Sequence, residues 1–547
     1  MKRLSGIILH PASLPNAEGI GTIGKEAFNF IDWLKNIKVG AWQMLPLGPT
    51  GYGDSPYASF SAFAGNPYLV NLEELYKNGF LEEGEFKEYK KNVQENTNPE
   101  RTDFGFIHYH KMRILKKAAS FVLNKIKTDS FLKTQVENFY REETFWLNDF
   151  ASFMTIKENY EERAKKENLS QGIWNEVWSK DLVINKKEKV SEFIKAHCEE
   201  YEIQKIIQFF FFSQWKKLKN YAKENNIDLI GDIPIFTALD SADVWQNQNL
   251  FLLDKEAKPE VSAGVPPDFF SSTGQLWGNP LYDWDKMKED SYLWWKTRIR
   301  HSLKLFDIIR LDHFRGFEAF WAIPQGAKTA QEGKWIKGPG HYFFEEIKKD
   351  LILLDEKYRE GLPILAEDLG VITPEVANLR DDFNFPTMKI LQFAFDLNEF
   401  KSENMVNPYL PHNHKKNCAV YTGTHDNDTI MGWLENSSEE VLKFIYTYLY
   451  GKKEDKSICS VLNTYEFKKE LASEIIRKAF SSVADFAAVQ MQDILFLNSE
   501  ARMNAPSTMG KNWQWRMTDS YQNCEMSEKL KLWNILYNRA RNLPPIQ

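Results

Sequence analysis

The stretch FDIIRLDHFRG, residues 306–316, combines two features that rarely share one strand. Its first half is apolar enough for a strand buried on both faces, as in a parallel sheet covered by helices. Its second half places Arg310 and Asp312 two residues apart and adds His313 and Arg315. Because side chains alternate along a strand, Arg310 and Asp312 point to the same side. Charges are costly in a core unless they are paired or used, so the stretch predicts a polar site where a buried strand ends.

Similar short apolar runs recur along the 547 residues. Together with the first stretch they make eight candidate strands, at residues 6–10, 41–48, 227–232, 307–312, 363–368, 389–395, 418–426 and 487–493. Segments with helical periodicity precede several of them, for example 25–37 before the second and 214–226 before the third. Helix followed by buried strand, repeated, predicts an α/β fold with a parallel sheet, and eight strands close a (β/α)₈ TIM barrel.

The candidate strands are unevenly spaced, which predicts one catalytic barrel over 1–547 with large insertions. Residues 75–205, between the second and third strands, are rich in Lys, Glu and Phe with helical periodicity, so we expect a mainly helical subdomain there. Residues 240–285 contain many turn-forming residues and predict a loop-rich insertion. The run IIQFFFFSQW, residues 206–215, is flanked by charged segments and predicts a well-buried helix.

Composition and charge narrow the classes of partner. The net charge of −7 gives no reason to expect binding to nucleic acid or to an anionic membrane. Four scattered cysteines without a CxxC pair are typical of a reducing compartment, and no uncharged apolar run is long enough to span a bilayer. The first apolar run ends at His10 and Pro11, too early for the core of a signal peptide. We therefore expect a cytoplasmic protein.

Polar residues stand at the carboxyl end of nearly every predicted strand. They are His10, Asp232, Asp312, Glu367 with Asp368, His425 with Asp426, and Gln492 with Asp493. Any single acidic residue there could instead cap the following helix, since Asp is a favoured N-cap. A ring of carboxylates around one barrel mouth is harder to explain by capping, because catalytic residues of TIM barrels occupy these strand ends.

The residue types at these strand ends favour glycosidic bond cleavage. Arg310 would keep Asp312 ionised and oriented, although a structural ion pair that closes the barrel is the alternative. Glu367, facing a second carboxylate in a site that excludes water, would have a raised pKa and could donate a proton. Cleavage of a glycosidic bond needs one charged and one protonated carboxyl group. His425 and Asp426 would hold sugar hydroxyls and offset positive charge on the reacting carbon.

Two motifs with other meanings are rejected. GIGTIG, residues 19–24, matches GxGxxG, but it does not directly follow a strand and no acidic residue stands about twenty positions later. THDND, residues 424–428, could suggest metal ligands, yet the chain has only 10 His and neither HxH nor HExxH. We expect no nucleotide cofactor and no catalytic metal.

Longer motifs of the chain resemble those of a known family, the 4-α-glucanotransferases of the amylomaltase type, which are also called disproportionating enzymes. This family belongs to the glycoside hydrolase clan of the α-amylases. The resemblance runs nearly end to end, except over about 80–200. It is carried by SGIILHPASLP, GIGTIGKEAFNFIDWL, WQMLPLGPTGYGDSPYASFSAFAGNPYL, GDIPIFTALDSADVW, GVPPDFFSSTGQLWGNPLYDW, IIRLDHFRG, AEDLGVIT, YTGTHDNDT and ARMNAPSTMGKNWQWR.

The resemblance implies a retaining transfer between glucans. The nucleophile falls on Asp312, the general acid/base on Glu367 and the stabiliser of the transition state on Asp426. Donors would be maltooligosaccharides, amylose and glycogen-derived dextrins, and glucose would also serve as an acceptor. The residues that the resemblance places against the sugars are Arg310, His425, Asp232, Tyr57, Phe269, Phe270 and Trp277. The last three belong to a loop that would arch over the site, although they could equally anchor that loop to the barrel, and Tyr57 could be ordinary loop packing.

Some features leave alternatives open. Ser507 and Thr387 stand where the family usually has Gly, which concerns local loop shape but not the carboxylates. A hydrolase with the same three carboxylates is the nearest rival. Amylases of that kind usually carry a C-terminal β-sandwich, for which we see no room after the eighth strand. A catalytically inactive glucan-binding barrel is the rival from another class, and the three retained carboxylates argue against it.

Overall fold

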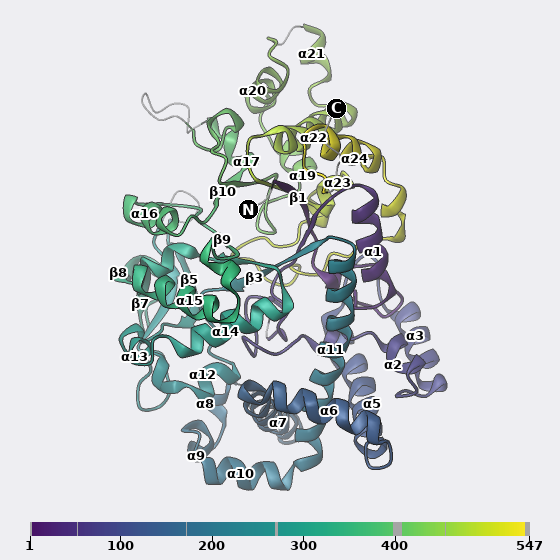
Figure 1. The fold of residues 1–547 in the computed structure, drawn as a ribbon, viewed down its shortest axis with the longest axis vertical. Coiled ribbons are helices and arrows are strands. Elements are labelled where there is room, and N and C mark those ends of the chain that lie inside the picture. The colour runs from purple at the N-terminus through teal and green to yellow at the C-terminus, as the bar shows by residue number, and fades with distance from the viewer. Residues whose placement is uncertain are drawn as a thin grey trace.

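The central sheet of the protein is a parallel barrel. The computed structural model describes residues 3–51, 53–170, 172–267, 272–397, 407–453 and 456–541 (Figure 1). Eight strands pair in the order β10-β11-β12-β1-β2-β3-β6-β9, and every pair is parallel. Their bounds are β1 (Leu4–Ile8), β2 (Ala41–Gln43), β3 (Asp228–Pro234), β6 (Ile308–Asp312), β9 (Ile364–Ala366), β10 (Thr387–Ile390), β11 (Cys418–Tyr421) and β12 (Phe486–Gln490). Each of the eight predicted runs overlaps a strand, although most of the run 389–395 is helical, and the (β/α)₈ prediction is confirmed.

Helices surround this sheet (Figure 1). Those that follow or precede its strands are α1 (Lys25–Asn36), α11 (Cys198–Glu224), α14 (Leu293–Leu305), α15 (Gly340–Leu354), α16 (Pro374–Asp382), α17 (Leu391–Ala394), α19 (Ile430–Glu435), α20 (Glu439–Tyr450), α21 (Lys456–Val461), α22 (Tyr465–Ser481), α23 (Met491–Ile494) and α24 (Met526–Leu536). The run 206–215 lies within α11, where Phe210, Phe211 and Trp215 are buried. The predicted buried helix is therefore confirmed.

A group of helices lies between β2 and β3 in the chain. They are α2 (Leu72–Lys77), α3 (Glu83–Asn96), α4 (Phe104–Phe106), α5 (Met112–Lys125), α6 (Ser130–Glu142), α7 (Thr144–Glu167), α8 (Trp174–Val177), α9 (Lys180–Val183) and α10 (Lys187–Ala196). In Figure 1, α7, α9 and α10 lie at the bottom of the view, opposite α20 and α21 at the top. Whether 75–205 is a separate subdomain stays a prediction.

A second sheet, of four antiparallel strands, stands beside the barrel in the order β5-β4-β7-β8. Its strands are β4 (Val261–Val265), β5 (Gln275–Pro280), β7 (Ala319–Pro324) and β8 (Lys334–Lys337). Two of these strands lie within 240–285, together with α12 (Ala242–Gln246) and the start of α13 (Trp284–Glu289). The sequence pattern predicted a loop-rich insertion and did not reveal these strands, because β4 pairs with β7 more than fifty residues later and local periodicity cannot show such a pair.

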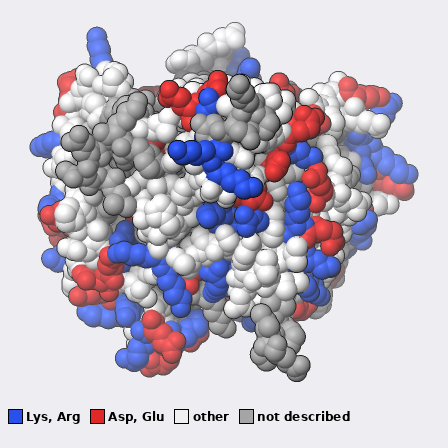
Figure 2. Space-filling view, turned by 90° about the horizontal axis from the view of Figure 1, so that it is seen from above, with Lys and Arg blue, Asp and Glu red and all other residues white. Residues whose placement is uncertain are grey.

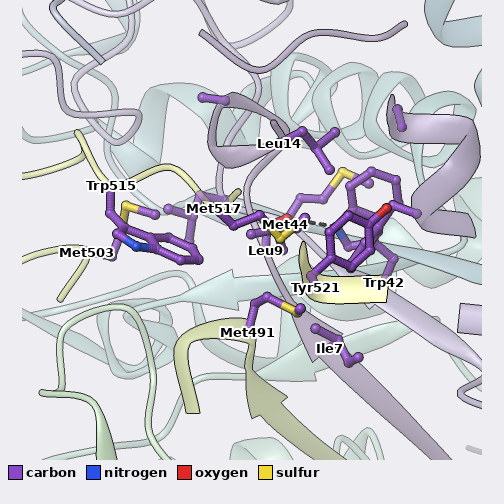
Figure 3. Packing of buried hydrophobic residues seen from close by; sticks show 14 of the residues in the cluster. Ile7, Leu9, Leu14, Trp42, Met44, Met491, Met503, Trp515, Met517 and Tyr521 are labelled. Carbon is purple, nitrogen blue, oxygen red and sulfur yellow. Dashed lines mark hydrogen bonds between the residues drawn. The ribbon is translucent and has the colours of Figure 1, made fainter. Parts of the chain in front are cut away.

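The core holds a C-terminal segment against the first two barrel strands. Figure 3 shows Met503, Trp515 and Met517 packed near Leu9 and Met44, all buried in one cluster. Hydrogen bonds fix the same contact, since Ser13 Oγ donates to the Trp515 carbonyl at 2.7 Å and Met517 N donates to the Ser13 carbonyl at 2.9 Å. Residues 503–517 are thereby anchored beside the barrel although they contain no barrel strand.

The GIGTIG segment is used for close packing. A Cβ at Gly21 would lie 2.0 Å from the Pro11 carbonyl oxygen, and one at Gly24 would lie 2.4 Å from Asn71 Nδ2. Both glycines therefore let the chain approach neighbouring groups that a side chain would exclude.

The surface mixes both signs of charge. Figure 2 shows Lys and Arg side chains interspersed with Asp and Glu over the face that it draws. Among the described residues, no helix has the length and apolar character that crossing a membrane requires.

Candidate active site

Arg310 joins two carboxylates at the ends of neighbouring strands. β3 and β6 pair with Asp232 opposite Arg310, so the two side chains meet. Arg310 Nη1 donates to both oxygens of Asp232, at 2.8 and 2.7 Å, and to Asp312 Oδ1 at 2.8 Å. Burial alone would lower the pKa of Arg310, but Asp232 and Asp312 raise it well above its usual value. The guanidinium is thus a permanent cation between two carboxylates.

Solvent reaches only one of these carboxylates. The Asp232 side chain is 1% exposed, whereas the Asp312 side chain is 28% exposed. Asp232 is therefore buried against Arg310, while Asp312 lies where another molecule can touch it.

Glu367 follows β9 and is held by main-chain groups on both oxygens. His313 N donates to Oε2 and Leu369 N donates to Oε1, each at 2.8 Å. His313 has a left-handed backbone, with φ of 50°. Burial, with the nearby charge of Asp312 as the next cause, raises the pKa of Glu367 to about 8. The raised pKa favours the protonated form of this carboxyl group at neutral pH.

His425 and Asp426 follow β11 and face Tyr57. The Tyr57 ring stacks on the His425 ring, with centroids 4.9 Å apart and planes 19° apart. Tyr57 Oη donates to Asp232 Oδ2 at 2.8 Å. Burial and the charge of Asp232 raise the pKa of Tyr57 well above its usual value, so its hydroxyl stays protonated. His425 Nε2 lies 3.4 Å from Asp426 Oδ2.

The 502–513 segment supports Asp426 from outside the barrel. Asn504 Nδ2 donates to Asp426 Oδ1 at 2.6 Å, and Asn504 N donates to the His425 carbonyl at 3.1 Å. Arg502 Nη2 donates to the Asp426 carbonyl at 2.5 Å. Trp513 packs 5.9 Å from the rings of both Tyr57 and His425. The strand-end argument missed Asn504, Arg502 and Trp513, although the motif ARMNAPSTMGKNWQWR contains all three.

Trp277 lies on the second sheet, beside the Asp312 loop. Its side chain is 38% exposed, and its ring stands edge-on to that of His313, with centroids 4.9 Å apart. Its Nε1 donates to Gln275 Oε1 at 3.1 Å, a contact within its own strand. Phe269 and Phe270 lie outside the described residues.

Three of the polar strand ends are structural groups. Asp493 is fully buried and accepts hydrogen bonds from Thr422 Oγ1 and from Ile430 N at the start of α19, both at 2.7 Å. Burial raises the pKa of Asp493 to about 7. His10 is buried, which lowers its pKa to about 3 and keeps it neutral. Asp368 bonds to the neighbouring strand β10. Asp493 therefore supports the start of α19, whose N-cap is Thr429, and does not cap the helix that follows its own strand.

The two positions where the family usually has Gly differ from each other. Ser507 has φ of 63°, the left-handed conformation that glycine adopts most easily. Thr387 opens β10 and is buried, and its hydroxyl donates to Asp368 Oδ2 at 2.7 Å.

No metal-ligand cluster stands out in the part of the chain that the structure describes, where no three His, Cys, Asp or Glu side chains are grouped to hold an ion. The absence of a metal and of a cofactor stays a prediction.

Comparison with known proteins identifies the family. A family model described as 4-alpha-glucanotransferase matches residues 9–522. The chain belongs to this family. Curated members from Clostridium butyricum and Thermus thermophilus, both named 4-alpha-glucanotransferase, are 43% and 41% identical. The match covers 97% of this chain in both cases, and 100% and 98% of the relatives. This 4-α-glucanotransferase family member is thus an enzyme that transfers glycosyl groups.

A solved structure supports the same conclusion. An amylomaltase from Streptococcus agalactiae, determined in complex with acarbose, is 35% identical and superposes with a TM-score of 0.87. The match covers 99% of this chain and 100% of that one. The predicted family and the predicted fold class are both confirmed.

Proposed function

We propose that this glucanotransferase works by a retaining double displacement with Asp312 as nucleophile and Glu367 as general acid/base. The observation that carries the proposal is the contrast between the two carboxyl groups. Asp312 is bonded to a permanent cation and is open to solvent, whereas burial and Asp312 raise the pKa of Glu367 to about 8. One charged and one protonated carboxyl group are what glycosidic bond cleavage needs.

In the first step, Asp312 attacks the anomeric carbon of the donor glucan and the bond from that carbon to the leaving oxygen breaks. Glu367 gives its proton to that oxygen, so the shortened glucan leaves with a hydroxyl group. In the second step, the 4-hydroxyl of an acceptor attacks the same carbon and the bond to Asp312 breaks. Glu367 takes the acceptor's proton, which returns both residues to their starting states.

Asp426 stabilises the positive charge that develops on the anomeric carbon. Its carboxylate is 47% exposed and is held by Asn504, which supports a fixed orientation toward bound sugar. His425 and Tyr57 offer hydrogen-bonding groups and a stacked pair of rings for the same sugar, and Asp232 keeps Arg310 in place. Charge placed before the reaction begins is the most effective form of transition-state stabilisation.

Transfer is favoured over hydrolysis where a sugar acceptor binds better than water. Trp277, exposed beside the Asp312 loop, supports such an acceptor position. Phe269 and Phe270 are assigned to it by resemblance alone. Apolar walls there would disfavour water at the position of the attacking hydroxyl.

The substrates we assign are maltooligosaccharides, amylose and glycogen-derived dextrins as donors, with glucan chains or glucose as acceptors. We assign the enzyme to the cytoplasm, because free cysteines without disulfide bonds are typical of a reducing compartment. The acarbose complex of the Streptococcus agalactiae amylomaltase supports a carbohydrate ligand.

Incubation of the pure protein with maltotriose tests this function. We expect glucose together with a ladder of oligomers longer than the substrate. Isotope-labelled glucose added as acceptor should enter the reducing ends of the ladder. A product mixture of maltose and glucose alone, with nothing longer than maltotriose, would indicate a hydrolase and overturn the proposal.

A further inference from the structure

The barrel has one seam that its main chain does not close. β9 pairs with β6, and β10 pairs with β11, each by a regular parallel register. β9 and β10 form the two ends of the strand order, and within the described residues no register joins them. The groups that bridge this seam therefore decide how β9, and the residues that follow it, are positioned.

The bridge is the carboxylate of Asp368. Its Oδ1 accepts from Met388 N at 2.7 Å, which replaces a main-chain bond between the strands. Its Oδ2 accepts from Thr387 Oγ1 at 2.7 Å and from Arg380 Nη1 at 2.5 Å. The Asp368 side chain is 1% exposed. A buried carboxylate with three donors, one of them charged, is held in a single position.

This bridge is continuous with the groups that hold Glu367. Glu367 N donates to the Leu311 carbonyl of β6 at 3.0 Å, and Leu369 N donates to Glu367 Oε1 at 2.8 Å. Asp368 lies between these two residues, so the bonds that hold its carboxylate also restrain the backbone that carries Glu367 and the Leu369 N–H. The reach of a proton donor is sensitive to displacements of this kind.

Thr387 is the residue of the bridge at which a substitution can remove one hydrogen bond with little change of shape. It begins β10 and is buried, and it is not among the residues with positive φ, so its backbone does not call for glycine. What it contributes is a hydroxyl donor to Asp368. Valine has nearly the same shape without that donor, and serine keeps the donor without the methyl group.

We propose that Asp368 and Thr387 are positioning residues that set the orientation of Glu367 across the β9–β10 seam. The inference rests on the proposed role of Glu367 as general acid/base. The hydrogen bond from Leu369 N lowers the pKa of Glu367, against the larger effect of burial. A loosened Asp368 lengthens that bond, so the pKa of Glu367 rises further and its proton is delivered less readily.

The test compares Thr387→Val with Thr387→Ser. We expect Thr387→Val to lower kcat for transfer from maltotriose about tenfold, the size of one lost hydrogen bond, with KM unchanged. The alkaline limb of its kcat profile should move to higher pH. Thr387→Ser should match the wild type in both respects. Thermal unfolding of each variant establishes that it is folded at the assay temperature.

Two results would overturn the inference. One is a folded Thr387→Val with the kcat and alkaline limb of the wild type, which makes the hydroxyl merely structural. The other is equal impairment of both variants, which makes side-chain volume the cause. If Thr387→Val does not fold, Arg380→Met removes another donor to the same oxygen and carries the same expectation. Arg359→Met, at an exposed pair with Glu356, is its control.

Glu367→Gln measured alongside separates this inference from the proposed function. An active Glu367→Gln overturns the role of Glu367, and the inference with it. If Glu367→Gln is inactive and Thr387→Val keeps the wild-type activity, the inference about the β9–β10 seam is overturned and the proposed role of Glu367 stands.

Discussion

Glu367 combines two influences that act in opposite directions on its carboxyl group. Two main-chain N–H groups favour the ionised form, whereas burial and the neighbouring Asp312 favour the protonated form. Burial is the largest of these effects, and the pKa rises from 4.5 to about 8. The residue can therefore release a proton in one step and recover it in the next at neutral pH.

The first residue-scale prediction concerns pH. Transfer requires protonated Glu367, so kcat/KM should fall as pH rises through about 8. Rates measured with maltotriose between pH 5 and about 10 test this expectation. A profile that stays flat through the alkaline range would contradict the raised pKa.

The free energy of unfolding should also depend on pH through the titration of Glu367. Between pH 4.5 and about 8, Glu367 is protonated in the folded protein and ionised in the unfolded chain. Folding stability from this group is therefore present below about pH 4.5 and decreases as pH rises to about 8. Glu367→Gln should accordingly gain thermal stability relative to the wild type as pH rises across this window. Melting temperatures at pH 5 and pH 8 test it, and a constant difference between the two proteins would contradict it.

The proposed role of Asp312 as nucleophile can be tested by substitution. Asp312→Asn keeps the size of the side chain but removes the nucleophile, so transfer should fall by at least about a thousandfold. The fold and the binding of maltooligosaccharide should remain, as circular dichroism and calorimetry can show. Asp355→Asn, at an exposed turn, is a matched control and should leave the rate unchanged. Residual turnover of more than a few per cent in Asp312→Asn would remove Asp312 from its role.

The strand-end residues could be predicted because each follows a recognisable apolar run. Asp312, Glu367 and Asp426 stand at one barrel mouth for that reason. Asn504 could not be found in this way, because its segment has no strand and is placed by the buried packing of Met503 and Trp515. Long-range packing of that kind leaves no periodic pattern in the sequence.

Among the secondary-structure elements, the barrel strands could be predicted from the sequence, whereas the strands of the second sheet within 240–285 could not. The barrel strands are short continuous apolar runs, several preceded by a helix, which is the pattern of a parallel sheet. β4 and β5 contain Gly, Ser and Pro, and β4 meets its partner β7 far along the chain. Only tertiary contact makes them strands, so the pattern predicted loops there.

Asp493 provides the prediction at this scale. It accepts from the first main-chain N–H of α19 and from Thr422, both inside the protein. Asp493→Ala leaves these donors without a partner and should lower the free energy of unfolding by about 1–3 kcal/mol. Urea unfolding curves measure the change. Asp355→Ala, which removes an exposed cap, should cost less, and equal losses in the two variants would contradict the role of burial.

At the level of the whole molecule, the proposed mechanism calls for no Lewis acid. The proposed roles give the nucleophile to Asp312, the proton to Glu367 and the stabilising charge to Asp426. Dialysis against a chelator should therefore leave the transfer rate unchanged. A loss of activity that calcium restores would contradict this expectation.

In the proposed mechanism a glucosyl unit becomes covalently attached to Asp312. A fluorinated glycosyl fluoride that slows the second step, followed by tryptic digestion and mass spectrometry, tests it most directly. We expect added sugar mass on the peptide Leu311–Arg315, and no added mass in Asp312→Asn. Label on the peptide that contains Glu367, or turnover of the reagent with no labelled peptide at all, would contradict it.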